Sequence, residues 1–214
     1  MAFLCTKKSA LLIFFALLLQ LQLIAQDRPE RIAYNGTLNL KDYTWPSETM
    51  VNLDGIWVFH WDELIYPEKT QLSKGEPEYF QLPDLWSNPS QNPKNYSTYG
   101  YASFTLKVLG QFKNKKLALQ VPSMYCSYTL WVNDQKVAQN GVVANNKEES
   151  KPFWKPMIGV FTSDSDTLNV ILQISNHHHS KGGIIESIKL GSEETVQKRM
   201  EQLKKANYIH IIGI

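Results

Sequence analysis

A run of three histidines, His177, His178 and His179, is the group of side chains with the most evident capacity for chemistry. Imidazole nitrogens bind transition metals, and two histidines at alternate positions of an extended chain face the same way. A metal site needs three or four converging ligands, however, and His60 and His210 stand alone in the sequence. Metal binding is therefore the less favoured interpretation, and we expect no metal and no cofactor. The favoured one is a polar strand end whose donors line the mouth of a ligand site.

Aromatic side chains in loops form a second set of candidates. Trp86 lies in the segment Leu-Pro-Asp-Leu-Trp and Trp154 in Pro-Phe-Trp-Lys-Pro, while Tyr125 comes just before an alternating segment. A loop aromatic offers a flat apolar face with a polar rim, which suits a sugar ring or another small ligand. The alternative is a ring that plugs the open end of the fold. We take Trp86, Tyr125, Trp154 and the three histidines as candidate ligand-binding residues.

Catalytic motifs are missing from the sequence. It contains no glycine-rich phosphate loop, no G-x-S-x-G elbow and no H-E-x-x-H motif. The acidic pairs Asp62-Glu63 and Glu148-Glu149 are adjacent residues, which point to opposite faces of an extended chain and so do not share a site. Cys126 lies in an alternating segment and is interpreted as a small buried residue rather than a nucleophile. We expect no catalytic residues and no enzymatic activity.

The first residues have the features of an export signal. Lys7 and Lys8 precede an apolar run, and the expected cleavage falls after Ala25 or Gln26, so that residues 1–26 form a signal peptide. An uncleaved signal anchor is the alternative, because the residues before that position are not the small ones that cleavage prefers. Cys126 would be the one cysteine of the mature chain, which excludes an internal disulfide.

The charge balance argues against one class of partner. The chain has 22 basic and 20 acidic residues, and the leader takes two lysines and no acid, which leaves 20 of each sign. Nucleic-acid binding depends on a net basic surface. We therefore expect no nucleic-acid partner.

Alternation of apolar and polar residues dominates residues 27–191. Apolar positions with a period of two predict antiparallel strands with one face on a core. Asn133–Lys136 and Asn140-Gly141 have the composition of turns. We expect one all-β domain, a β-sandwich or jelly roll. The alternating segments are 56–61, 101–108, 116–121, 126–132, 167–174 and 184–190.

The pattern changes after Gly191. Ser192 is suited to cap a helix, and Val196, Met200 and Leu203 recur at helical spacing, which predicts a helical stalk over 192–207. Residues 208–214 are apolar after the tyrosine at their start apart from His210, and seven residues are too few to cross a bilayer. We favour the interpretation that they begin a transmembrane helix over that of an apolar tail.

Taken together, several segments resemble the extracellular domain of bacterial seven-transmembrane receptors with diverse intracellular signalling modules. The resemblance covers about Asn52 to Glu194 and rests on the ordered set Leu53–Trp61, Leu82–Trp86, Gly100–Val108, Met124–Asn133 and Ile174–Gly183. The sequence is also similar, more distantly, to the galactose-binding-like jelly roll at the N-terminus of family 2 glycoside hydrolases.

The resemblance implies an exported input domain on the periplasmic side of the bacterial inner membrane, joined to a membrane region and a cytoplasmic output module. It also implies a carbohydrate or another small molecule as ligand, and it carries over no binding residue. The resemblance does not decide between a monomer and a homodimer. Two alternatives remain: a non-catalytic carbohydrate-binding module of a secreted glycoside hydrolase, and a periplasmic scaffold that binds protein.

Overall fold

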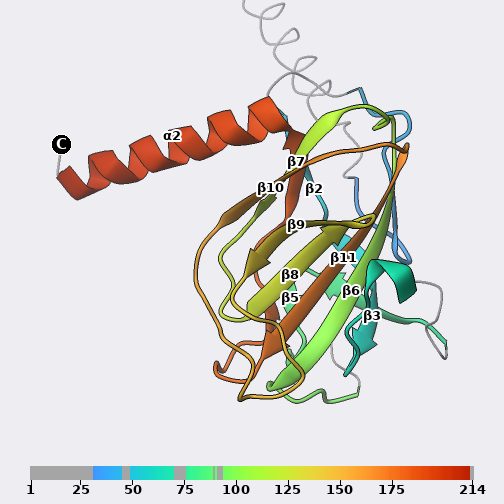
Figure 1. Cartoon of the computed structure of the whole chain (residues 1–214), viewed down its shortest axis with the longest axis vertical. Coiled ribbons are helices and arrows are strands. Elements are labelled where there is room, and N and C mark those ends of the chain that lie inside the picture. Colours follow the sequence, from blue (N-terminus) through green and yellow to red (C-terminus); the bar gives the residue numbers. More distant parts are fainter. Residues whose placement is uncertain (1–30, 45–48, 70–75, 89, 91–93, 213–214) are drawn as a thin grey trace, which may run out of the picture. The chain divides into compact units, whose positions relative to one another are not determined.

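The computed structural model describes residues 31–44, 49–69, 76–88, 90 and 94–212, with side chains as far as residue 205. The expected signal peptide, residues 1–26, lies outside the described residues. In the described part, two β-sheets pack on one hydrophobic core and a long α-helix follows the last strand (Figure 1). The all-β sandwich predicted from the alternating pattern is confirmed.

The larger sheet has seven strands, and its longest are β6 (Gly100–Leu109) and β11 (Thr167–Asn176). These two pair antiparallel along their whole length. The order across the sheet is β4 (Glu78–Leu82), β3 (Gly55–Trp61), β6, β11, β8 (Ser127–Val132) and β9 (Gln135–Asn140). Strand β1 (Thr37–Asn39) runs parallel to the end of β6.

The smaller sheet has four strands in the order β10 (Met157–Thr162), β7 (Lys116–Val121), β13 (Lys189–Ser192) and β2 (Val51–Asn52). A short pair, β12 (Gly183–Ile184) and β5 (Asp84–Leu85), stands apart from both sheets. The 3-10 turn η1 (Pro67–Lys69) follows β3. The single strand predicted over 184–190 is thus wrong, because Gly183 and Ile184 pair with β5 whereas Lys189 onward pairs with β7.

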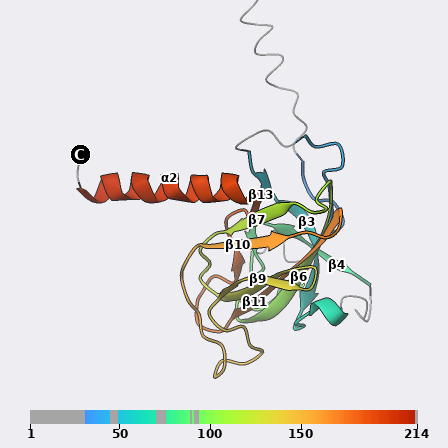
Figure 2. The ribbon, with the colours of Figure 1, turned by 45° about the horizontal axis from the view of Figure 1, so that its top comes forward.

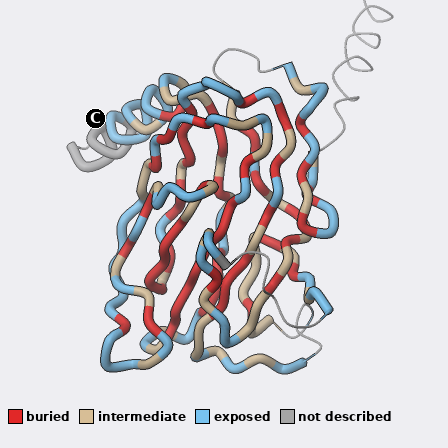
Figure 3. The backbone as a smooth tube through the Cα atoms, turned by 45° about the vertical axis from the view of Figure 1, so that its right-hand side comes forward, coloured by how far each residue is buried: buried red, intermediate tan, exposed pale blue. Residues whose placement is uncertain are grey.

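The inward faces of the strands agree with the alternating pattern. Buried residues run along the strands, while exposed residues gather in the loops and along the helix (Figure 3). Alternate residues of β6 and β7 point into the core, as the sequence predicts. These inward residues are Ala102, Phe104, Leu106, Val108, Leu117, Leu119 and Val121.

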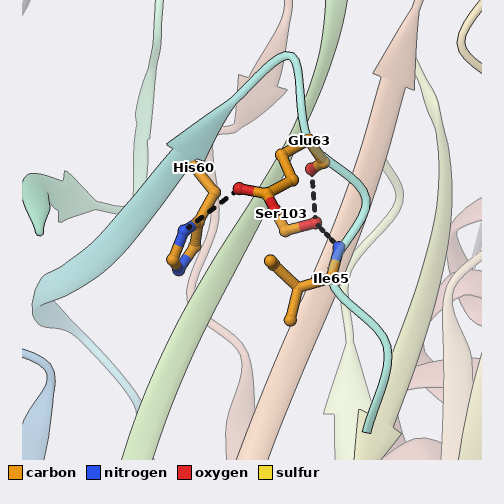
Figure 4. A network of polar contacts seen from close by, with 4 residues as sticks. All are labelled: His60, Glu63, Ile65 and Ser103. Carbon is orange, nitrogen blue, oxygen red and sulfur yellow. Dashed lines mark hydrogen bonds and ion pairs between the residues drawn. The ribbon is translucent and has the colours of Figure 1, made fainter. Parts of the chain in front are cut away.

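Much of the outward face of β8 and β11 is buried as well, although the alternating pattern predicts one polar face; Gln173 and Ser175 are buried, whereas Asn169 is exposed. The loop after β3 and the loop after β9 form hydrogen bonds to this face. Gln173 of β11 is 2% exposed and donates from Nε2 to the carbonyl oxygen of Ile65 over 2.8 Å. The Ser103 hydroxyl of β6 donates to the carbonyl oxygen of Glu63 over 2.8 Å and accepts from the Ile65 amide over 2.9 Å (Figure 4). Polar outward residues can be buried here because the loop backbone satisfies their hydrogen bonds.

The helix α2 (Glu193–Ile212) begins as the sequence predicts. The Thr195 amide donates to the Ser192 hydroxyl over 3.1 Å, which is the N-cap interaction. Its first turns lie against the smaller sheet, where Val196 is fully buried, and the helix then extends away from the strands (Figure 2). No helix in the described part of the chain combines the length and apolar composition that crossing a membrane requires. The start of a transmembrane helix at residues 208–214 stays a prediction.

Candidate ligand-binding surface

The long loop between β9 and β10, residues 141–156, is fixed to the body of the domain by a buried group of serines. The Ser175 hydroxyl of β11 lies 2.8 Å from the Ser127 hydroxyl and 3.1 Å from the Ser150 hydroxyl. It also accepts a hydrogen bond of 3.2 Å from the Ala144 amide. All three serines are at most 3% exposed, so the loop is held by hydrogen bonds that water does not weaken.

Two of the predicted histidines hold the same loop. His177 Nε2 lies 3.1 Å from the carbonyl oxygen of Ala144, and His178 Nε2 lies 3.1 Å from that of Ser150. A carbonyl oxygen only accepts, so both Nε2 atoms carry a proton and donate. These nitrogens are therefore not available as metal ligands or as contacts for a small molecule. No group of three or more His, Cys, Asp or Glu side chains in the described residues is arranged to hold a metal ion.

The third histidine takes part in an aromatic cluster. The His179 ring stacks on Tyr125 with centroids 4.3 Å apart and planes at 6°. Trp154 meets Tyr125 edge-on at 5.2 Å and His179 at 6.2 Å. We call Tyr125, Trp154 and His179 the aromatic platform. Trp154 is 60% exposed, so the platform presents a large ring to solvent.

Hydrogen bonds fix the orientation of His179. Its amide donates to the side-chain oxygen of Asn176 over 3.1 Å, and its carbonyl oxygen accepts from Asn176 Nδ2 over 2.7 Å. The Lys181 amide donates to His179 Nδ1 over 3.1 Å. Nδ1 is therefore unprotonated, and the Nε2–H is left as a donor. The Lys181 ammonium lies 5.5 Å from the centre of the Tyr125 ring and adds a positive charge beside the platform.

Trp86 does not belong to this surface. It is fully buried, and its Nε1 donates to the carbonyl oxygen of Thr98 over 3.2 Å. Its indole fills the space beside Gly182, where a Cβ atom would stand 2.5 Å from the ring. The expectation that Trp86 offers a face to a ligand is therefore wrong. The ring plugs the end of the sandwich and packs against Trp61, with ring centroids 5.5 Å apart. The structure thus brings together Tyr125, Trp154 and His179 out of the six candidates.

The cluster offers surfaces for binding and no evident nucleophile. Cys126, next to Tyr125, is 1% exposed, and its thiol points at the carbonyl oxygen of Gly183, 3.5 Å away. Burial raises the pKa of the Cys126 thiol to about 11, so the thiol is protonated near neutral pH. Stacked rings, an imidazole N–H and an ammonium suit a molecule with an apolar face and polar edges, such as a sugar.

Comparisons with known proteins support the fold. No protein-family model matches the chain, and no curated protein matches its sequence. A β-glucuronidase from Ruminococcus gnavus, solved in complex with C6-substituted uronic isofagomine, matches with a TM-score of 0.50 and 14% identity over 66% of this chain and 28% of that one. A GH2 β-galacturonidase from Eisenbergiella tayi bound to galacturonate matches with a TM-score of 0.48 and 15% identity. That match covers 71% of this chain and 26% of the enzyme. The chain spans little more than a quarter of these enzymes, and at this identity the first match shows a shared sheet-rich fold.

Proposed function

We propose that the domain is a non-catalytic binding domain for a carbohydrate or a similar small molecule, which lies on the aromatic platform. The observation that carries the proposal is the joint placement of Tyr125, Trp154 and His179 from three separate loops. A fixed aromatic surface with a tryptophan that is 60% exposed is costly to expose unless something binds to it. The similarity to a sheet-rich part of a β-glucuronidase is consistent with a galactose-binding-like jelly roll and hence with this class of function.

A thermal-shift screen of methyl glycosides tests the proposal. At a hundredfold excess over the dissociation constant, one bound ligand stabilises the domain by about 2.7 kcal/mol, which is a shift of several degrees. Trp154→Ala should abolish the shift without unfolding the domain, because Trp154 is mostly exposed. Phe153→Ala is the matched control, since Phe153 is 58% exposed and lies next to the platform without belonging to it. An equal shift in the wild type and in Trp154→Ala would remove the platform from the site.

For the context of the domain we propose the input part of a bacterial transmembrane receptor, exported to the periplasmic side of the inner membrane. The family resemblance supports this, and so does α2, which continues directly from the last strand of the sandwich. A carbohydrate-binding module of a secreted glycoside hydrolase fits the fold similarity equally well. Sequencing the gene beyond codon 214 separates the two, because the receptor requires further apolar spans and the module requires a soluble catalytic domain.

A further inference from the structure

A hollow of about 600 Å³ lies between α2 and the body of the domain. We call it the α2 hollow. It lies on the face of the smaller sheet where the first turns of the helix pack. Its lining includes Gln120, Ser123, Pro156, Ile185, Met200 and Leu203.

The segments that build the aromatic platform also build this hollow. Tyr125 follows Ser123 by two residues, and Trp154 precedes Pro156 by two. The segment that holds Lys181 reaches the hollow at Ile185. Two residues of extended chain span at most about 7 Å, so the platform and the hollow adjoin along separate stretches of backbone.

The lining of the α2 hollow is mixed in a way that suits an amphipathic group. Ile185 is 44% exposed and Leu203 is 38% exposed, and the half-buried Met200 lies beside them. Glu186, Lys189 and Lys204 add charged groups to the wall. An apolar group at this place would cover the aliphatic side chains while the charged groups around it stay in water.

We infer that the ligand site extends from the aromatic platform into the α2 hollow, and that the ligand is a glycoside with an apolar aglycone. The sugar ring lies on Trp154 and the aglycone lies against Met200 and Leu203. This inference rests on the proposed function of the platform. It adds that the bound ligand touches α2 itself.

Direct contact with the ligand would matter for α2 because the helix is anchored to the domain mainly through its first turns. Val196 is fully buried, and Glu193 forms an ion pair of 2.7 Å with Lys116. From Gln197 to Lys205 every described side chain except Met200 is exposed. A ligand in the hollow therefore adds contacts between this part of the helix and the body of the domain, and it favours one packing of α2 over others.

Matched pairs of methyl and phenyl β-D-glycosides of glucose, galactose and glucuronate test the inference by titration calorimetry. The phenyl ring of each pair probes the hollow, and burying part of it is expected to tighten binding roughly tenfold over the methyl glycoside. The double variant Met200→Ala, Leu203→Ala should remove this gain and leave the affinity for the methyl glycoside unchanged. Glu201→Ala, an exposed position on the same helix, is the control and should keep the gain.

The possible outcomes separate the two proposals. If the methyl glycosides bind through Trp154 while their phenyl partners bind no tighter, the extension is wrong and the platform stands. If phenyl glycosides still bind more tightly than methyl glycosides to the Met200→Ala, Leu203→Ala variant, the extension of the site into the α2 hollow is also wrong. If no glycoside of either kind binds, the proposed function fails and the inference fails with it. Near-ultraviolet circular dichroism shows whether each variant keeps the native fold.

Discussion

His179 stacks on Tyr125 with the ring planes 6° from parallel and the centroids 4.3 Å apart. The pair joins the loop after β11 to the loop before β8. Asn176, 1% exposed, holds the His179 backbone through two hydrogen bonds, so the stack is set before any ligand arrives. A binding surface ordered in advance loses less side-chain entropy when it binds.

Removing the His179 imidazole should therefore lower the affinity for a glycoside clearly and the unfolding free energy only modestly. His179→Ala removes one face of the stack, and we expect a loss of about 0.5–1.5 kcal/mol in unfolding free energy together with a clear loss of glycoside affinity. His179→Phe keeps a ring for Tyr125 but loses Nδ1, the acceptor of the Lys181 amide. Urea denaturation and calorimetry measure the two effects. The exposed Ser180→Ala is the control, and equal affinities in His179→Ala and Ser180→Ala would contradict the prediction.

Ser175→Ala should destabilise the domain although it removes a single oxygen. The hydroxyl accepts from the Ala144 amide and lies within hydrogen-bond distance of Ser127 and Ser150. Its loss leaves buried partners unsatisfied, at a cost of about 1–3 kcal/mol.

Hydrogen exchange gives a second measurement on Ser175→Ala. The Ala144 amide should exchange faster in the variant, while the amides of β6 change only with global stability. Ser187→Ala, which removes a half-buried serine bonded to Asp54, is the control at a site away from the loop. An unchanged Ala144 amide would show that Ser175 does not hold the loop.

The strand faces show how far the sequence alone could predict this fold. Alternation identified the inward residues of β6 and β7, because a period of two marks the side toward the core. The alternation wrongly predicts that Gln173 is exposed. The loop that contains Ile65 covers this side chain, and Ile65 is more than a hundred residues away in the sequence. A covering loop leaves no periodic signal in the strand it covers, so Gln173 has the sequence pattern of an exposed residue.

The candidate site shows the same limit. Tyr125, Trp154 and His179 were identified singly as loop aromatics or polar donors, but no local pattern places three loops side by side. Trp86 and Trp154 both lie within three residues of a proline, yet one is fully buried and the other is 60% exposed. The difference lies in Gly182, which leaves room for the Trp86 ring and is almost a hundred residues away from it.

Trp86 should accordingly behave as a core residue. Trp86→Ala is expected to cost about 3–5 kcal/mol of unfolding free energy, the range for truncating a buried tryptophan. Gly182→Ala places a methyl group against the same ring and should also destabilise the domain. Trp154→Ala serves as the contrast and should change the urea midpoint little. Similar midpoints for the two tryptophan variants would show that Trp86 is not packed as described.

His60 should make stability depend on pH in the acidic range. Burial lowers the pKa of His60, against the opposing effect of the carboxylates of Glu63 and Glu78. The side chain is 10% exposed, and its Nδ1 lies 3.9 Å from Glu63 Oε2 (Figure 4). Because the folded pKa lies below the unfolded value of about 6.5, the unfolded chain binds a proton first as the pH falls.

The contribution of His60 is therefore fully present above pH about 6.5 and is lost as the pH falls through its lowered pKa in the folded state. Urea denaturation of the wild type and of His60→Gln between pH 7.5 and 4.5 isolates this effect, because the other titrating groups are common to both proteins. The wild type should lose more stability than His60→Gln over this range. As a control, Ser180→Ala, which changes an exposed residue that does not titrate, should follow the wild type. Parallel curves for the wild type and His60→Gln would show that the His60 pKa is the same in the folded and unfolded chains.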